Sequence, residues 1–278
     1  MRSFDFTGTT AVVTGAGSGI GRNIALGLAK RGVKGLALCD IREDLVQETA
    51  SLLEASGVHV SVHVFDIAER SAIEALPAQV LTAHDSVEVL VNNAGVTLGG
   101  TFDACTIDEF EWVLTINLLG VTRMTRVFLP QLKQVSSAQI INISSLFGLI
   151  SVPGQAAYCA SKFGVRGFSD ALRHELAGSD ISVTTVHPGG VNTNIAKSAR
   201  MSESATEEEI EAGLRQAEQN LVMPPSKASD IILRGVERRR PRVLVGKDAH
   251  ILHWLERLMP SSYWGLMARR LGRAKTEG

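Results

Sequence analysis

Short apolar runs alternate along the chain with longer segments in which apolar residues recur every three or four positions. The short runs predict strands at Thr10–Thr14, Gly35–Cys39, Val58–Phe65, Val87–Val91, Ala138–Ile143, Ile181–Val186 and Arg242–Val245. The longer segments predict helices at about Ile20–Lys30, Ile41–Ala55, Ala68–Ala83, Thr106–Leu132 and Ala156–Ala177. Such alternation is typical of a parallel sheet with right-handed crossovers and helices on both faces. We therefore expect a doubly wound α/β fold of about seven strands.

Composition and net charge favour one main domain and argue against a nucleic-acid partner. Hydrophobic residues make up 45% of the 278 residues, which is enough for a large core. No long Pro-, Gly- or Ser-rich stretch divides the sequence, so we expect one domain over residues 1–247 and a helical tail over residues 248–278. The formal net charge of −1 argues against a nucleic-acid partner.

The cysteines and the N-terminus indicate the compartment. Cys39, Cys105 and Cys159 are too few and too scattered for a disulfide framework or a metal cluster. We therefore expect a reducing compartment and no metal site. Residues 1–6 contain no apolar signal core, and no apolar run approaches the roughly 20 residues of a membrane helix. A cytoplasmic protein is the expectation.

A glycine-rich turn, TGAGSGIG at Thr14–Gly21, lies between the first predicted strand and the first predicted helix. Gly15 permits a tight turn, Gly19 lets the backbone approach a pyrophosphate, and Gly21 lets the helix pack closely on the sheet. The helix N-terminus offers N–H groups and partial positive charge to phosphates. An ordinary glycine-rich turn is the alternative, but the strand–turn–helix context favours a Rossmann-like dinucleotide site.

Two aspartates follow neighbouring predicted strands. Asp40 ends the second strand, 19 residues after Gly21, where a carboxylate binds the adenosine ribose and repels a 2′-phosphate. NAD is therefore favoured over NADP, although Arg42 could soften the repulsion. Asp66 ends the third strand and either meets the adenine or caps the helix that is predicted to start near Ala68.

Tyr158 and Lys162 lie four positions apart, on one face of a predicted helix, and Ser145 follows the fifth strand. A free tyrosine, with a pKa of about 10, is too weak a base at neutral pH. Shifting the pKa to about 7 requires roughly 4 kcal/mol, which a close ammonium and a positive nicotinamide ring supply in a dry site. Ser145 would hold the substrate oxygen near Tyr158. The alternative is a surface packing pair.

Ordered motifs extend this picture along the chain. They are TGAGSGIG at 14–21, NNAG at 92–95, Asn117, ISS ending at Ser145, YCASK at 158–162 and HPGGVNT at 187–193. In this order and spacing, the chain resembles the compact single-domain branch of the short-chain dehydrogenase/reductase family from about Phe4 to Val245.

The resemblance implies further roles. Asn92–Gly95 would stabilise the sheet and line the adenosine side, Lys162 would also hold the nicotinamide ribose, and Asn117 would bend its helix and hold a water that links Lys162 to solvent. Simpler structural roles for these asparagines, in a turn and a helix kink, are compatible. The implied catalytic residues are Asn117, Ser145, Tyr158 and Lys162. The predicted cofactor-binding residues are Gly15, Gly17, Ser18, Gly19, Ile20, Gly21, Asp40, Arg42, Asp66, Ile67, Asn93, Ala94, Gly95, Tyr158, Lys162, Pro188, Gly189, Val191 and Thr193.

Three segments are expected to select the substrate: Val96–Phe102, Leu146–Gln155 and Gly190–Met223. The second is apolar, which favours a lipophilic alcohol or ketone; ordinary packing under a loop is the equal alternative. The third is charged and is expected to form a lid helix that orders when ligand binds.

The C-terminal region is basic, with 11 Lys and Arg against 4 Asp and Glu in residues 234–278. Ile251, Leu255 and Leu258 have helical spacing, and Pro260 ends the pattern. Peripheral binding to an anionic membrane is one hypothesis. Packing on the domain or on a second subunit is the preferred alternative. The family resemblance itself implies a homodimer or homotetramer built through the two long helices.

We expect an NAD-dependent oxidoreductase that interconverts a secondary alcohol and a ketone. An epimerase or dehydratase of the same cofactor fold resembles longer chains with a second domain. A cofactor-sensing binding protein should lack Ser145, Tyr158 or Lys162, and this chain has all three.

Overall fold

The centre of the molecule is a seven-stranded parallel sheet with the order β3-β2-β1-β4-β6-β7-β9. A computed structural model describes residues 3–193, 199–202, 206, 208, 211, 215 and 219–276. The strands are β1 (Thr10–Thr14), β2 (Gly35–Asp40), β3 (His59–Val64), β4 (Val89–Asn92), β6 (Ala138–Ile143), β7 (Ile181–Pro188) and β9 (Arg242–Val245). Every neighbouring pair in this sheet is parallel, so the predicted doubly wound fold is confirmed.

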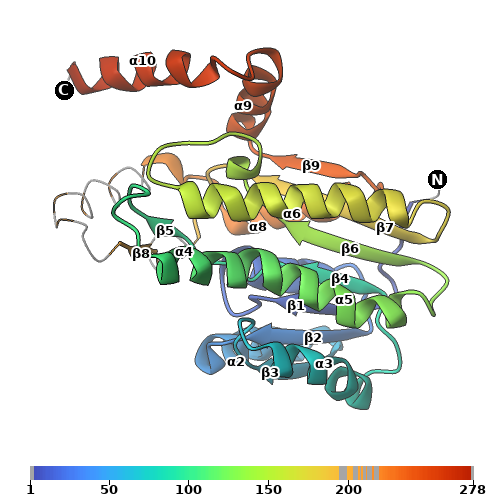
Figure 1. The fold of residues 1–278 in the computed structure, drawn as a ribbon. Helices are drawn as coiled ribbons and strands as arrows, with labels where there is room; N and C mark the ends of the chain where they lie inside the picture. Colours follow the sequence, from blue (N-terminus) through green and yellow to red (C-terminus); the bar gives the residue numbers. More distant parts are fainter. Residues whose placement is uncertain are drawn as a thin grey trace.

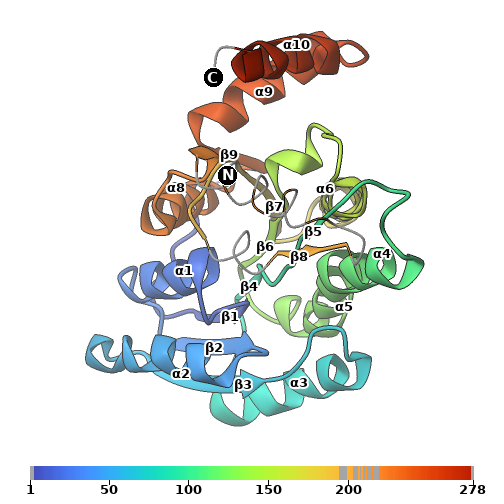
Figure 2. The same cartoon turned by 90° about the vertical axis from the view of Figure 1, so that its left-hand side faces the viewer.

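Helices cover both faces of the sheet (Figure 2). One layer contains α1 (Gly19–Ala29), α2 (Glu43–Ser51) and α8 (Pro225–Glu237). The other contains α3 (Arg70–Ala83), α4 (Ile107–Leu114), α5 (Gly120–Leu132) and α6 (Ala156–Glu175). The strand order reverses between β1 and β4, and ligands of such sheets bind at that reversal, beyond the carboxyl ends of the strands.

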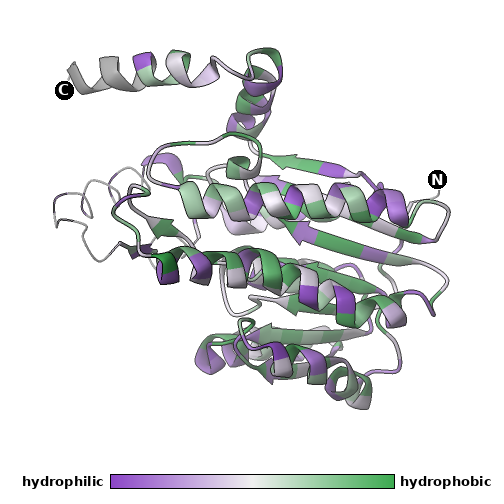
Figure 3. Ribbon diagram, viewed as in Figure 1, coloured by the Kyte–Doolittle hydropathy of each residue, from purple (hydrophilic) through white to green (hydrophobic). Residues whose placement is uncertain are grey.

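Two hydrophobic clusters, one on each face, make up most of the core. Ile24, Leu28 and Ile232 pack with β1 and β2 on one side, and Ile73, Met124 and Phe128 pack with β4 and β6 on the other. The strands are accordingly mostly hydrophobic in colour in Figure 3. Burial on both faces explains why the central strands β1, β2 and β4 are mostly apolar, whereas the edge strand β3 alternates and is only partly buried.

The structure differs from the sequence prediction in two places near the carboxyl edge. The long helix predicted over Thr106–Leu132 is present, but a π-helical turn at Thr115–Leu119 interrupts its α-helical hydrogen bonding between α4 and α5. A small parallel sheet also pairs β5 (Leu98–Gly99) with β8 (Arg200–Met201), and both strands are too short to produce a periodic signal. The helix predicted from Ile41 ends at Ser51 and is followed by a short 3-10 turn, Glu54–Ser56.

The chain ends in two helices that we call the C-terminal arm: α9 (Lys247–Leu258) and α10 (Tyr263–Thr276). Both views place the arm beyond the β9 edge of the sheet, and in Figure 1 α10 stands clear of the layers below it. α9 ends before Pro260, as its sequence predicts. Within the described residues, no helix is long and apolar enough to cross a membrane.

Candidate active site

The glycine-rich turn connects β1 to α1 at the point where the strand order reverses. Gly15 and Gly19 have φ values of +64° and +54°, which side chains rarely adopt. A Cβ on Gly21 would collide with the carbonyl oxygen of Gly15, so a larger residue would push α1 away from the turn. Ser18, the N-cap residue, makes no side-chain capping bond to the first turn of α1. The turn thus presents backbone and a helix N-terminus, the requirements of a pyrophosphate cradle.

The NNAG segment after β4 fastens this turn to the sheet. The side chain of Asn93 donates to the carbonyl oxygens of Thr14 and Gly15 at 3.0 and 3.2 Å. Thr14 Oγ1 accepts from the backbone N–H groups of Asn93 and Ala94 at 2.9 and 3.0 Å. Asn92 is buried and donates to Asn142 across the β4–β6 pair at 2.8 Å. These hydrogen bonds give the NNAG segment a structural role, next to the predicted binding site for the adenosine half of the cofactor.

Asp40 lies at the tip of β2 and touches the glycine-rich turn. Its Oδ2 accepts from the backbone N–H of Gly17 at 2.8 Å, and its Oδ1 accepts from that of Arg42 at 3.0 Å. The guanidinium of Arg42 pairs with Asp44 at 2.9 Å, and that pair lies in solvent. Arg42, the cation that could offset the negative charge of Asp40, is therefore paired with Asp44.

Asp66 does not cap a helix, which was the alternative to adenine binding, but makes a local turn bond. Its Oδ1 accepts from the backbone N–H of Ala68 at 2.8 Å, which caps a turn. α3 itself begins later, at Arg70, with Glu69 as its N-cap residue. The side chain of Ile67 packs into the core against Gly120. Any contact of these two residues with a dinucleotide stays a prediction.

Tyr158 and Ser145 meet at the carboxyl edge of the sheet. Interaction with the Ser145 side chain lowers the pKa of Tyr158, but burial has the larger effect and raises it to about 12. The Phe147 ring packs edge-on against the Tyr158 ring with the centroids 6.2 Å apart. Ser144, the other member of the doublet, donates to the carbonyl oxygen of Lys162 at 2.9 Å. Ser145, rather than Ser144, is thus the serine of the doublet that lies beside the phenol.

Lys162 is almost fully buried beneath Tyr158. Its Nζ lies 5.6 Å from the centre of the Tyr158 ring and donates to the carbonyl oxygen of Ile143 at 3.1 Å. Burial lowers the pKa of Lys162 to about 8, because a charged ammonium loses its hydration there. The predicted juxtaposition of phenol and ammonium is therefore present.

Asn117 lies inside the π-helical turn and connects that turn to the strand edge. Its Oδ1 accepts from the backbone N–H of Val96 at 2.8 Å, and its Nδ2 donates to the Val96 carbonyl at 2.9 Å and to Ser161 Oγ at 3.0 Å. A Cβ on Gly95 would lie 3.1 Å from Asn117 Oδ1 and 3.4 Å from Lys162 Nζ, so the two side chains flank one glycine. Asn117 thus lies in an irregular turn of its helix, and the predicted bend and water relay remain predictions.

The loop after β7 closes the other side of the site. A Cβ on Gly19 would lie 3.2 Å from the Thr193 side chain, so this loop meets the glycine-rich turn. The backbone N–H of Gly190 donates to Asp248 Oδ2 at 2.6 Å, and Val191 pairs with Met223. The start of α9 therefore holds the loop that is predicted to contact the nicotinamide.

Three residues in these contacts were not predicted from sequence. Asp248 lies 58 positions after Gly190, and only the fold brings them together. His187 is buried, and its Nδ1 donates to the carbonyl oxygen of Ser145 at 2.8 Å. Burial lowers the pKa of His187 to about 3, so a neutral imidazole holds the serine backbone. Thr14, the third, lies in the glycine-rich motif, but nothing in the sequence indicated that its hydroxyl accepts hydrogen bonds from Asn93 and Ala94.

The predicted substrate segments occupy different positions. Leu146 and Ile150 are buried beneath the C-terminal arm, where they pack with Leu252, Tyr263 and Met267. Packing under a loop is thus the correct interpretation for those two residues, whereas Phe147 alone is described against the Tyr158 ring. Most of the charged lid segment, residues 205–219, lies outside the described residues, as do the neighbouring residues 194–198.

A parallel sheet with a glycine-rich turn at its strand-order reversal, and a Ser–Tyr–Lys group with a buried lysine beside it, define an oxidoreductase of the nicotinamide-dependent class. The sequence profile of the short chain dehydrogenases matches residues 9–204. The chain therefore belongs to the short-chain dehydrogenase/reductase family.

Individual relatives agree with this membership. SadH of Mycobacterium tuberculosis, an oxidoreductase by name, is 40% identical over 266 residues, which cover 95% of both chains. A family member from Burkholderia phymatum, solved in complex with NAD, is 30% identical with a TM-score of 0.85 over 92% of this chain and 95% of its own. A short chain dehydrogenase from Mycobacterium paratuberculosis, solved bound to NAD, is 25% identical with a TM-score of 0.76 over 87% and 97% of the chains.

The buried ammonium predicts a pH-dependent stability. Unfolding returns the pKa of Lys162 from about 8 to its ordinary 10.5, so the unfolded chain binds more protons between these values. Stability should therefore rise with pH across this window, by about 3 kcal/mol in wild type relative to Lys162→Met. Urea unfolding of both proteins at several pH values in the window measures the effect. Lys227→Met, on the exposed surface of α8, is the control, and a pH-independent difference for Lys162→Met would contradict the assignment.

The hydrogen bond from Gly190 to Asp248 predicts that a residue outside the sequence motifs affects cofactor binding. Asp248→Ala removes the acceptor of the Gly190 N–H, so NADH should bind about three- to tenfold more weakly. Asp248→Asn keeps an acceptor and should lose less. Fluorescence titration with NADH measures binding, with the exposed Asp85→Ala as a control. Equal affinity of Asp248→Ala and wild type would show that this bond does not support the loop.

Proposed function

We propose that this protein interconverts a secondary alcohol and a ketone, with NAD(H) as the hydride carrier and Tyr158 as the proton-transfer residue. The observation that carries the proposal is the convergence of Ser145, Tyr158 and Lys162 at the carboxyl edge of the sheet. When bound, the nicotinamide supplies or accepts the hydride. A dinucleotide fits the residues present, because the glycine-rich turn has a left-handed backbone and Asp40 stands beside it.

The side chains have separate tasks in this reaction. Ser145 donates a hydrogen bond to the substrate oxygen and keeps it next to the Tyr158 hydroxyl. Tyr158 takes the alcohol proton during oxidation and returns it during reduction. Lys162, held by the Ile143 carbonyl, stabilises the phenolate by its charge and binds the nicotinamide ribose. Asn117 connects Lys162 to solvent through a water, which restores the proton.

NAD is the proposed cofactor in preference to NADP. Asp40 is placed for the adenosine ribose and would repel a 2′-phosphate. The Arg42 guanidinium, which could accept that phosphate, is engaged with Asp44. Relatives from Burkholderia phymatum and Mycobacterium paratuberculosis were solved with NAD, which supports the same choice.

A lipophilic substrate is the proposed class. The half-buried Phe147 ring lies against the phenol, and apolar Leu98 packs with Val113 and Ala157 where β5 approaches the start of α6. Near this region, the Arg200 guanidinium lies 4.0 Å from the centre of the Trp112 ring in a cation–π contact. We propose that a ketone or alcohol with an apolar body occupies this side of Tyr158.

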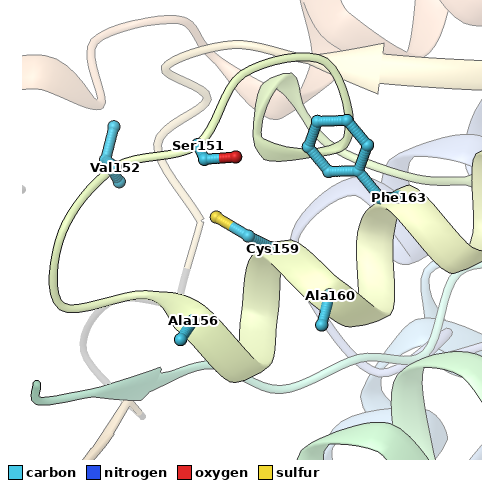
Figure 4. Close-up of a pocket in the computed structure, with 6 residues that line it drawn as sticks. All are labelled: Ser151, Val152, Ala156, Cys159, Ala160 and Phe163. Carbon is cyan, nitrogen blue, oxygen red and sulfur yellow. The ribbon is translucent and has the colours of Figure 1, made fainter. Parts of the chain in front are cut away.

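We further propose a homodimer or homotetramer built through the long helices. α6 has an outward apolar face that includes Ala156, Ala160 and Phe163. Figure 4 shows Cys159 pointing from this helix toward Ser151, and these two residues line a pocket of about 400 Å³. An apolar hollow on a long helix face is suited to a second copy rather than to the reacting substrate.

Removal of the phenol hydroxyl tests the reaction. Tyr158→Phe should lower kcat about 10²- to 10⁴-fold, because no other described group replaces the proton donor. NADH affinity, measured by fluorescence titration, should change little, which separates chemistry from binding. Turnover is followed by NADH absorbance with a panel of hydrophobic secondary alcohols and ketones. Retention of turnover by Tyr158→Phe would leave the cofactor-sensing alternative, or another proton donor, as the better account.

The carboxylate at the tip of β2 predicts the cofactor preference. Asp40→Ser should raise the NADP to NAD ratio of kcat/KM about tenfold or more, because a like charge next to the 2′-phosphate is removed. Asp44→Ser should release the Arg42 guanidinium and improve NADP while leaving NAD unchanged. Initial rates with both cofactors measure the ratio. A wild-type preference for NADP, or an unchanged ratio in Asp40→Ser, would contradict this assignment.

A further inference from the structure

The exposed hydrophobic side chains of this protein concentrate on the C-terminal arm. Of the 14 large hydrophobic residues that are exposed in the described part of the chain, five lie between residues 251 and 266. They are Ile251, Trp254, Leu258, Met259 and Leu266. The other nine are scattered over residues 41–222. Single exposed apolar residues are ordinary, whereas such a concentration marks an interaction surface.

α9 has two apolar faces, and the domain covers only one of them. Ala249 and Leu252 pack inward against the segment after β6. Ile251, Trp254 and Leu258, spaced by three and four positions, are 66%, 56% and 74% exposed. Of the sequence hypotheses for Ile251 and Leu258, packing on the domain is not met, because Ala249 and Leu252 take the inward positions. The outward stripe has no partner within the described chain.

Basic residues outnumber acidic residues on the arm. Lys247 and Arg257 are exposed on α9, which also carries the half-buried Glu256, whereas Asp248 is turned inward to the Gly190 N–H. The sequence of α10 contains Arg269, Arg270, Arg273 and Lys275 and no acidic residue. Residues 234–278 carry 11 basic against 4 acidic residues, whereas the rest of the chain carries 17 against 25. The arm is thus a basic, apolar projection on an acidic body.

Charge favours a lipid surface over a second arm. The five exposed side chains offer roughly 500 Å² of apolar surface, which is enough for either occupant, so charge decides between them. A symmetric contact would bring two cationic arms together. An anionic bilayer instead attracts the arginines and lysines, and it accepts tryptophan and leucine at its headgroup boundary. Trp254 and the half-buried Trp264 both lie on this arm.

We propose that the C-terminal arm docks this protein on anionic lipid bilayers, with Ile251, Trp254 and Leu258 inserted at the headgroup boundary and the surrounding cations over anionic headgroups. The arm also touches both loops of the site. Tyr263 Oη accepts from the Ser151 backbone N–H at 2.8 Å, and Asp248 holds Gly190. Docking therefore places the bilayer beside the segments that border Tyr158.

Vesicle co-sedimentation of the full-length protein tests the proposal without any need for turnover. Wild type should bind vesicles of phosphatidylcholine with phosphatidylglycerol, should bind phosphatidylcholine alone far less, and should be released by high salt. The double variant Trp254→Ser/Leu258→Ser should bind about tenfold more weakly, because it loses most of the inserted apolar surface. Tryptophan emission should shift to the blue on binding in wild type and not in this variant.

A matched double variant controls for the loss of exposed apolar surface. Leu52→Ser/Leu81→Ser changes two exposed leucines, one at the end of α2 and one on α3, remote from the arm, and should bind vesicles as wild type does. Circular dichroism and light scattering check folding and mass. Absence of wild-type binding to anionic vesicles, or equal binding by the arm variant, overturns the proposal. A loss of oligomer mass in the arm variant without vesicle binding would assign the stripe to a second copy and overturn it as well.

Discussion

The placement of one buried ammonium beside one phenol is the constraint on which the site depends. Lys162 loses its hydration under Tyr158, and the Ile143 carbonyl is the described acceptor that compensates it. The free-energy cost of burying the charged ammonium appears in the pKa of Lys162, which falls to about 8. A dry site also raises the pKa of Tyr158, so burial alone works against a phenolate. The same low polarity strengthens the attraction between a phenolate and any nearby cation, so the function requires both effects together.

The fold holds this pair by fixing its surroundings from several strands. β6 supplies Ser145 and the Ile143 carbonyl, and His187 on β7 holds the Ser145 backbone. The π-helical turn brings Asn117 to the same edge. Because these elements end at one edge of a parallel sheet, small shifts of any strand would change the distance between hydroxyl and ammonium. The predicted adenosine side depends in the same way on Asn93 and Thr14.

Local patterns were sufficient to predict the sheet, its helices and the Ser–Tyr–Lys group, because each depends on short-range spacing. The i,i+4 relation of Tyr158 and Lys162 follows from helix geometry alone. The bond from Gly190 to Asp248 could not be predicted, since it joins residues 58 positions apart through the tertiary fold. The π-helical turn was missed because its residues keep a helical pattern. The direction of α9 was also missed, because apolar residues occupy both of its faces and periodicity cannot tell which is covered.

The central claim is that a positive nicotinamide and Lys162 together make the buried phenol acidic. Tyr158 and Tyr263 are the only tyrosines, so ¹³C-labelled tyrosine NMR resolves both, with Tyr263 as an internal reference. In the free protein, the pKa of Tyr158 should lie near 12. Saturation with NAD⁺ should lower it by several units, and Lys162→Met should abolish most of that shift. A Tyr158 pKa that is unchanged by NAD⁺, or lowered equally in Lys162→Met, would contradict the account.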